Sequence, residues 1–260
     1  MKQTQKIVLT GLMTALVFLL TFLVKIPIPF TSGYIHLGDS MIFLSVLAVG
    51  PFYGAFAAGM GSMLSDLLGG YAQYALPTLI IKSLMALLMG LAMSGKTKRS
   101  IFIAAGTAFV VWAGFLTALL AGLRQAVATY GASLSLAVVP EGGPAELEAA
   151  SRMSRNLPVY LLLAFIGVVL VVATAAWFIA RREGEGAFTF RALLGMTAGG
   201  MCMIIGYWLT DAFIMGYGTL AATFSVPMNL LQFAGGILIA AALSPGVHKA
   251  RNAIFPMQAQ

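Results

Sequence analysis

Six polar residues stand inside otherwise apolar stretches of this chain, and their side chains have the chemistry of a binding site. They comprise three carboxylates, one ammonium and two amides: Asp39, Asp66, Asp211, Lys82, Asn229 and Gln232. A charged side chain in hydrocarbon costs about 2.5 to 3.5 kcal/mol on insertion scales, so each charge indicates a function or a specific partner. Two hypotheses follow: a small-molecule site, or a structural ion pair of Lys82 with Asp66 or Asp211.

Aromatic residues and a histidine accompany these polar side chains. The candidates are Tyr34, His36, Tyr74 and Trp208, the last with Tyr207 beside it. Aromatic rings line ligand pockets, although Tyr and Trp also gather at membrane interfaces, and the sequence leaves both interpretations open for the tyrosines. Because the sequence brings carboxylates, amides, one lysine and aromatic rings together, we favour a substrate-binding site.

The composition identifies the class of protein that must position these residues. Sixty percent of the 260 residues are apolar and nine percent are charged, whereas charged residues make up about 25% of soluble domains. The apolar runs are long and continuous rather than short and alternating, which favours helices over a barrel. We expect an all-α polytopic membrane protein in the cell membrane, formed by residues 1–260 as a single integral membrane domain.

Seven apolar segments predict the membrane helices. They cover residues 7–24, 40–68, 76–94, 101–123, 157–180, 192–216 and 225–244. The second segment is too long for one crossing, and Gly50 and Pro51 stand near its middle, where a helix should break. Dividing it there gives eight predicted helices.

The positions of Lys and Arg predict the orientation of these helices. With eight crossings, ten of the fifteen basic residues fall on the side of the N-terminus and four on the other. Because basic residues accumulate on the cytoplasmic side, both termini are predicted to be cytoplasmic. The net charge of +7 is therefore explained by topology, and no nucleic-acid partner is expected.

The predicted topology places the polar residues at one level of the membrane. Counted at about 1.5 Å per residue from the helix ends, all six lie in the outer half of the bundle. The long outer loop, residues 124–156, contains PAELEAASRMSR, which predicts a short helix with Glu148 and Arg152 paired at i, i+4. A polar ligand would reach the site from outside.

One motif suggests nucleotide binding and is rejected. GLAMSGKT, residues 90–97, matches the phosphate-loop pattern. That pattern needs a strand before it and a helix N-terminus at the phosphates, whereas here a membrane helix leads into it. We expect no enzyme activity in this chain.

Three pairs of small residues at i, i+4 predict close helix contacts. Gly50 with Gly54, and Gly195 with Gly199, are interpreted as packing contacts within the bundle. Gly11 and Ala15 lie near the cytoplasmic end of the first helix, where a separate partner could also reach them.

Several stretches resemble the substrate-binding S components of energy-coupling factor (ECF) transporters, closest to the group that takes up vitamins and their precursors. They are YIHLGDSMIFL, VGPFYGAFAAGMGSMLSDLLGGYA and LPTLIIKSLMALLMG, and also GYWLTDAFIMGYG and SVPMNLLQFAGGIL, which are similar to the family's last two helices. The resemblance covers residues 1–95 and 190–251. Because such S components have six helices, residues 100–185 are interpreted as an inserted helix pair with its outer loop.

The resemblance implies a binding subunit of an ATP-binding cassette importer without ATPase activity. Its partners would be the vitamin or precursor, membrane lipid, a scaffold transmembrane subunit and two cytoplasmic ATPase subunits; no cofactor or metal is implied. The family's docking motif falls on Gly11 and Ala15, with Gly in place of the usual Ala. Its substrate site falls on Tyr34 to Asp39 and the later helices, where family members more often have Asn than His36.

Two other functions are compatible with intramembrane charges. An ion-coupled secondary transporter would use Asp66, Asp211 and Lys82 as a proton relay, but two halves with matching broken helices are not evident. An intramembrane aspartyl protease would use Asp66 and Asp211, but LSDLL and LTDAF lack a recognisable catalytic surround. For the substrate, pyridoxine-like or hydroxymethylpyrimidine-like compounds are the first hypothesis, followed by pantothenate and riboflavin.

Overall fold

The computed structural model describes residues 2–94, 98–181 and 188–254, and these residues are almost entirely helical. Within these ranges, eight helices of 12 residues or more form the bundle: α1 (Gln3–Leu23), α2 (Gly38–Val49), α3 (Pro51–Leu68), α4 (Ala72–Met93), α5 (Lys98–Tyr130), α7 (Pro144–Arg181), α8 (Phe190–Leu209) and α10 (Ser225–Ile254). Within the described ranges, six helical stretches are long and apolar enough to cross a membrane. The all-α polytopic fold is therefore confirmed.

The break between α2 and α3 lies where the sequence predicts it. Gly50 has φ +86°, a conformation that glycine adopts without steric cost, and its N–H donates to the Val46 carbonyl at 2.9 Å. Pro51 then begins α3, at a helix position that needs no N–H donor. Residues 40–68 thus form parts of two helices.

Small residues set the close contacts of the inner helices. A Cβ atom added to Gly195 or Gly199 would lie 2.5 Å from the carbonyl oxygen of Met89 or Met85, respectively, so α8 and α4 touch backbone to backbone. A Cβ atom added to Gly54 would lie 2.9 Å from Cα of Val46, which brings α3 against α2. Gly195, Gly199 and Gly54 therefore act in packing, as expected, whereas a Cβ atom on Gly50 would have no neighbour within 4 Å and Gly50 serves the helix break instead.

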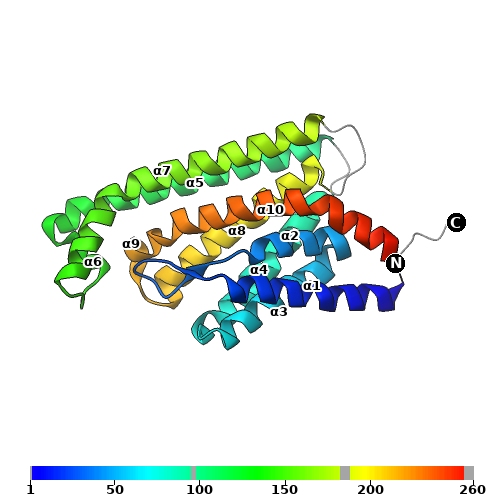
Figure 1. Cartoon of the computed structure of the whole chain (residues 1–260). Helices are drawn as coiled ribbons and strands as arrows, with labels where there is room; N and C mark the ends of the chain where they lie inside the picture. The colour runs from blue at the N-terminus through cyan, green and yellow to red at the C-terminus, as the bar shows by residue number, and fades with distance from the viewer. Residues whose placement is uncertain (1, 95–97, 182–187, 255–260) are drawn as a thin grey trace.

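Helices α5 and α7 lie side by side along one side of the bundle, next to α8 and α10 (Figure 1). Trp112 of α5 attaches the pair to the core, with ring centroids 5.1 Å from Phe165 of α7 and 6.4 Å from Phe233 of α10. Only 11% of the α5 span is buried, against 44% of the α4 span. Most of α5 therefore faces the surroundings of the bundle.

The sequence predicts a short separate helix within residues 144–155, and the structure shows that this prediction is wrong. This stretch is the first part of α7, and α5 likewise continues beyond its predicted end to Tyr130. Glu148 and Arg152 do pair, at 3.2 Å. Because the stretch is rich in Ala and Glu and carries this pair, it supports a helix without lipid around it. Between the two helices lie η1 (Gly131–Ser133) and α6 (Leu134–Val138).

The start of α1 and the end of α10 lie at the same end of the bundle (Figure 1). The opposite end carries a small antiparallel hairpin made of β1 (Ile26–Pro27) and β2 (Tyr34–Ile35). It also carries η2, a π-helical turn (Thr210–Ile214), and α9 (Gly218–Thr223). We call this the outer end, following the topology predicted from the basic residues.

Candidate functional site

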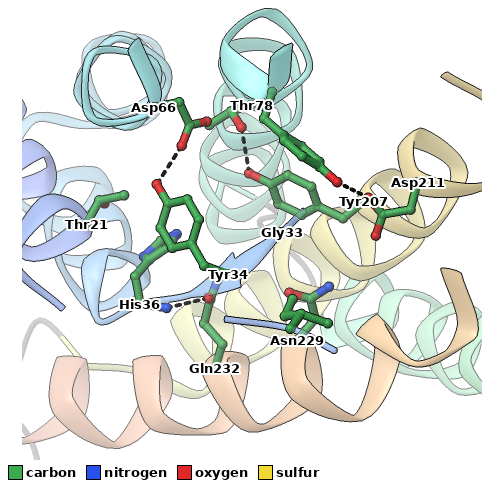
Figure 2. A pocket seen from close by; sticks show the side chains of 12 residues that line it. Thr21, Gly33, Tyr34, His36, Asp66, Thr78, Tyr207, Asp211, Asn229 and Gln232 are labelled. Atoms are coloured by element: carbon green, nitrogen blue, oxygen red, sulfur yellow. Dashed lines mark hydrogen bonds between the residues drawn. The ribbon is translucent and has the colours of Figure 1, made fainter. Parts of the chain in front are cut away.

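A small polar cavity lies under the β-hairpin at the outer end of the bundle (Figure 2). It has a volume of about 30 Å³. Its walls come from α1, the hairpin, α3, α4, α8, η2 and α10. They are formed by Thr21, Ile28, Gly33, Tyr34, His36, Asp66, Tyr74, Thr78, Tyr207, Asp211, Asn229 and Gln232. Seven of the ten side chains predicted from the sequence to bind substrate line it: Tyr34, His36, Asp66, Tyr74, Asp211, Asn229 and Gln232.

Two carboxylates of the cavity wall are each bound by a tyrosine. The Tyr34 hydroxyl donates to Asp66 Oδ1 at 2.5 Å, and the Tyr74 hydroxyl donates to Asp211 Oδ1 at 2.6 Å (Figure 2). We call these four residues the tyrosine–carboxylate layer. In the described part of the chain neither carboxylate forms a salt bridge. Neither therefore has a cationic partner there, and a carboxylate can accept about four hydrogen bonds.

Local backbone features position this layer. Asp66 lies in the last turn of α3, and Tyr74 lies in the first turn of α4. Asp211 belongs to η2, where the backbone widens into a π turn before Gly216, whose φ is +74°. Such π turns often occur at functional sites, because they redirect one side chain without ending the helix.

A second cluster, formed by Asp39, Lys82 and Gln232, lies beside the cavity. Lys82 Nζ is 2.5 Å from Asp39 Oδ1, and both side chains are buried almost completely. Gln232 Nε2 donates to Asp39 Oδ2 at 2.8 Å. Lys82 also contacts Met203 Sδ at 3.1 Å. We call this the ion-pair cluster. It joins α2, α4, α8 and α10.

The ion-pair cluster corrects one expectation about these residues. Lys82 pairs with Asp39, and not with Asp66 or Asp211 as the sequence suggested. Asp39 and Lys82 are absent from the cavity wall, and their contact with substrate stays a prediction. A buried pair of this kind is satisfied by its own partners, so its geometry fits a structural role.

The β-hairpin is bonded to this cluster through His36. The His36 backbone N–H donates to Gln232 Oε1 at 2.8 Å, and His36 Nδ1 accepts from the Gly38 N–H at 3.0 Å. Burial lowers the pKa of His36 to about 3, and the nearby Lys82 ammonium acts in the same direction. His36 is therefore neutral at physiological pH, and Nε2 carries its proton.

Lys25 lies on the other side of the hairpin, among aromatic rings. Its ammonium is 4.9 Å from the ring centroids of both Tyr34 and Tyr71, and 4.8 Å from that of Phe22. Burial lowers the pKa of Lys25, while the Asp66 carboxylate acts against this shift. For Tyr34, burial first and the Asp66 charge second raise the pKa of the phenol. Tyr34 is therefore a hydrogen-bond donor throughout the physiological range.

Trp208 does not reach the cavity, and its neighbour Tyr207 does. The indole N–H of Trp208 donates to Thr223 at 3.3 Å, and its ring packs against Phe115 of α5 at 5.9 Å. The Tyr207 hydroxyl donates to Thr78 Oγ1 at 3.1 Å on the cavity wall (Figure 2). Successive helix residues point about 100° apart, so one of the two aromatic residues had to face away.

Sequence reasoning missed Tyr207, Thr78 and Thr21 as wall residues. Tyr207 is adjacent to Trp208 in the sequence, and only the orientation of the helix decides which of the two faces the cavity. Thr78 lies one helical turn before Lys82, a spacing that places both on one helix face. Thr21 gave no signal, because threonine is common in membrane helices.

The fold and the cavity together define a class of protein. Apolar helices surround a small site whose polar groups suit hydrogen bonding to an organic molecule. In the described residues no group of three or more His, Cys, Asp or Glu is placed to hold a metal ion. The class is a polytopic α-helical membrane protein with a polar small-molecule cavity.

The family follows from comparison with known sequences. The family model described as "ECF-type riboflavin transporter, S component" matches residues 1–146, which is more than half of the chain. The chain therefore belongs to this family of S components. It is a multi-pass protein of the plasma membrane.

A curated relative extends the comparison. An uncharacterized protein from Pyrococcus woesei, described as lying in a gap 3' region, is 46% identical over 77 residues, which are 30% of this chain and 51% of the relative. This chain thus spans about half the length of that relative. No solved structure matches the chain.

Proposed function

We propose that this S component captures a water-soluble vitamin at its outer end and that riboflavin is its substrate. The observation that carries the proposal is the tyrosine–carboxylate layer on the cavity wall, in a chain whose family description names riboflavin transport. The description supports riboflavin over the pyridoxine-like compounds that the sequence alone suggested first.

The charges of the cavity select for the chemistry of the substrate. Asp66 and Asp211 line the cavity without a salt bridge in the described residues, whereas the Lys82 ammonium is already paired with Asp39. Carboxylate oxygens accept hydrogen bonds and repel anions. The site therefore favours a neutral or cationic molecule rich in donors. Riboflavin carries hydroxyl donors and a ring N–H on a flat ring, whereas pantothenate carries a carboxylate.

Substrate entry requires the β-hairpin to move. Pockets for small organic ligands have volumes of about 300 to 1,000 Å³, and this cavity has about 30 Å³. The hairpin forms the wall nearest the outside. Its attachments include the hydrogen bonds of Tyr34 and His36 and the 5.0 Å ring contact of Phe30 with Phe224. Outward movement of the hairpin would open the site without disturbing the helices.

The proposed docking surface lies on α1, away from the cavity. Gly11 and Ala15 are exposed on α1, and no other atom lies within 4 Å of a Cβ built on Gly11. A flat strip of small residues lets another helix approach closely. We propose that the scaffold subunit of the ECF module binds here and that its two ATPase subunits hydrolyse ATP. This chain would have no enzyme activity; residues 95–97 of GLAMSGKT lie outside the described residues.

The alternative of an ion-coupled transporter would need Asp66, Asp211 and Lys82 to exchange protons. The Lys82 ammonium is bonded to Asp39, and each of the two carboxylates is bonded to a tyrosine. This arrangement supports separate structural and binding roles over a relay.

Binding to the purified protein tests the substrate. Riboflavin should bind with quenching of its fluorescence, and unlabelled pyridoxine, hydroxymethylpyrimidine and pantothenate should fail to displace it at hundredfold excess. Displacement by one of these three compounds at equal concentration would transfer the assignment to that vitamin.

Copurification with the ECF module tests the docking surface. Gly11→Leu and Ala15→Leu should abolish recovery of the scaffold subunit and ATP-driven uptake, while riboflavin affinity stays unchanged. Gly114→Leu is the matched control, because Gly114 is an exposed helix glycine on α5 with equally open space around it. Equal recovery of the scaffold with all three variants would place docking elsewhere.

A further inference from the structure

Thr21 behaves differently from other threonines in the helices of this chain. In a helix, a threonine hydroxyl usually donates to the carbonyl four residues earlier. Thr10, Thr14, Thr117, Thr197 and Thr223 all do so, at 2.6 to 2.9 Å. The Thr21 hydroxyl has no hydrogen-bond partner among the described residues.

The position of Thr21 makes this free hydroxyl unusual. The residue is 1% exposed and lies in the last turn of α1, where its side chain forms part of the cavity wall. Three serine hydroxyls are also buried without a partner in the described residues, but none of them lines the cavity. Figure 2 shows Thr21 on α1, across the cavity from Asp211.

The start of α2 leaves space for this hydroxyl. A Cβ atom on Gly38 would overlap Thr21 Oγ1, so only glycine at the start of α2 leaves room for it. A buried hydroxyl without a partner is unfavourable for folding, and valine would fill the same space without that cost. Packing alone therefore gives no reason for a threonine here.

We propose that Thr21 is a specificity-determining residue whose hydroxyl forms a hydrogen bond with the bound substrate. This inference rests on the proposed function and adds a contact from α1 to those of the other helices. The substrate would then be held from two sides, by Thr21 on α1 and by the tyrosine–carboxylate layer on α3, α4 and η2. Because a hydroxyl both donates and accepts, Thr21 suits a ribityl hydroxyl or a polar atom of the flavin ring.

Three threonine variants test the proposal by riboflavin titration. Thr21→Val keeps the shape of the side chain and should weaken riboflavin binding five- to twentyfold, while the melting temperature without substrate stays the same or rises. Thr21→Ser restores the hydroxyl and should bind within threefold of wild type. Thr10→Val is the matched control on the same helix and should not change affinity, because its hydroxyl serves only the Lys6 carbonyl.

Lumiflavin, which has a methyl group in place of the ribityl chain, locates the bond. If Thr21→Val lowers the affinity for riboflavin alone, the hydrogen bond goes to the ribityl chain. If it lowers the affinity for both ligands equally, the hydrogen bond goes to the flavin ring. Wild-type affinity in Thr21→Val would overturn the proposal, as would a loss that Thr21→Ser does not restore. If wild type binds no flavin at all, the proposed substrate is wrong, and this proposal falls with it.

Discussion

The ion-pair cluster and the tyrosine–carboxylate layer both hold carboxylates inside the bundle, but they stabilise them by different means. Asp39 is paired with the Lys82 ammonium and accepts a hydrogen bond from the Gln232 amide, in a place with almost no exposure. Asp66 and Asp211 are each bonded to a neutral tyrosine and lie on the cavity wall. The first arrangement has a cationic partner, and the second has none among the described residues.

The difference separates stability from binding. A carboxylate paired with a buried ammonium cannot lose its partner without leaving a charge in a low-dielectric interior. A carboxylate that accepts from a phenol retains lone pairs that a donor-rich ligand can use. We therefore expect changes in the ion-pair cluster to lower stability and changes in the tyrosine–carboxylate layer to lower affinity.

The largest expected effect is the loss of stability in Lys82→Met. Removing the ammonium leaves Asp39 buried and unpaired, which should destabilise the protein by about 3 to 5 kcal/mol. Thermal unfolding in detergent without substrate measures this. The double variant Asp39→Asn with Lys82→Met should recover part of the lost melting temperature, because no unpaired charge then remains in this cluster. An unchanged melting temperature in Lys82→Met would contradict a structural role.

The next effect is the loss of affinity in Asp66→Asn and Asp211→Asn. Each variant removes a charged acceptor, and a hydrogen bond to a charged group contributes about 1.5 to 3 kcal/mol, which is about a ten- to hundredfold change in Kd. The melting temperature without substrate should change little. Riboflavin titration and thermal unfolding on the same preparations check both statements. Wild-type affinity for riboflavin in both folded variants would show that the tyrosine–carboxylate layer does not bind the substrate.

A pH effect on stability follows from His36. Its folded-state pKa is lowered to about 3, below about 6.5 in the unfolded chain. As pH falls the unfolded chain binds the proton first, so the stabilisation is complete above pH 6.5 and is lost progressively toward pH 3. By pH 5 the loss should be about 1 to 2 kcal/mol.

His36→Asn isolates this contribution. Asparagine can still accept from the Gly38 N–H but does not titrate, so the melting temperature of the variant should fall less than that of wild type between pH 7 and pH 5. If the melting temperatures of the two proteins fall equally with pH, the pKa of His36 does not differ between the folded and unfolded states.

The smallest effect distinguishes two adjacent aromatic residues. Tyr207→Phe removes a hydroxyl on the cavity wall and should weaken riboflavin binding by about 0.5 to 1.5 kcal/mol, the range of a neutral hydrogen bond. Trp208→Phe should leave affinity unchanged, because Trp208 packs against Phe115 and donates to Thr223 outside the cavity. Comparing the two titrations checks which of the two side chains faces the cavity. A larger loss of affinity in Trp208→Phe than in Tyr207→Phe would show that Trp208 faces it.

Local chemistry allowed the sequence to predict the class, the helices and their main break. Hydrophobic runs long enough to cross a bilayer need no tertiary partner to be recognised. Gly50 and Pro51 end and begin helices by their own backbone restrictions, and Glu148 pairs with Arg152 one turn away. Four cavity residues, Asp66, Asp211, Asn229 and Gln232, could also be predicted, because a polar group in an apolar run is costly and therefore informative. Aromatic character and the family resemblance added Tyr34, His36 and Tyr74.

Tertiary structure alone decided how these polar residues divide into two groups. Asp39, Asp66 and Asp211 stand in similar apolar contexts, yet only Asp39 lies against Lys82, which is 43 residues away along the chain. The orientation of α8 selected Tyr207 over Trp208, and the packing of Gly38 against α1 left the Thr21 hydroxyl on the cavity wall. Partner choice depends on which faces of packed helices meet, and a single helix sequence does not contain that information.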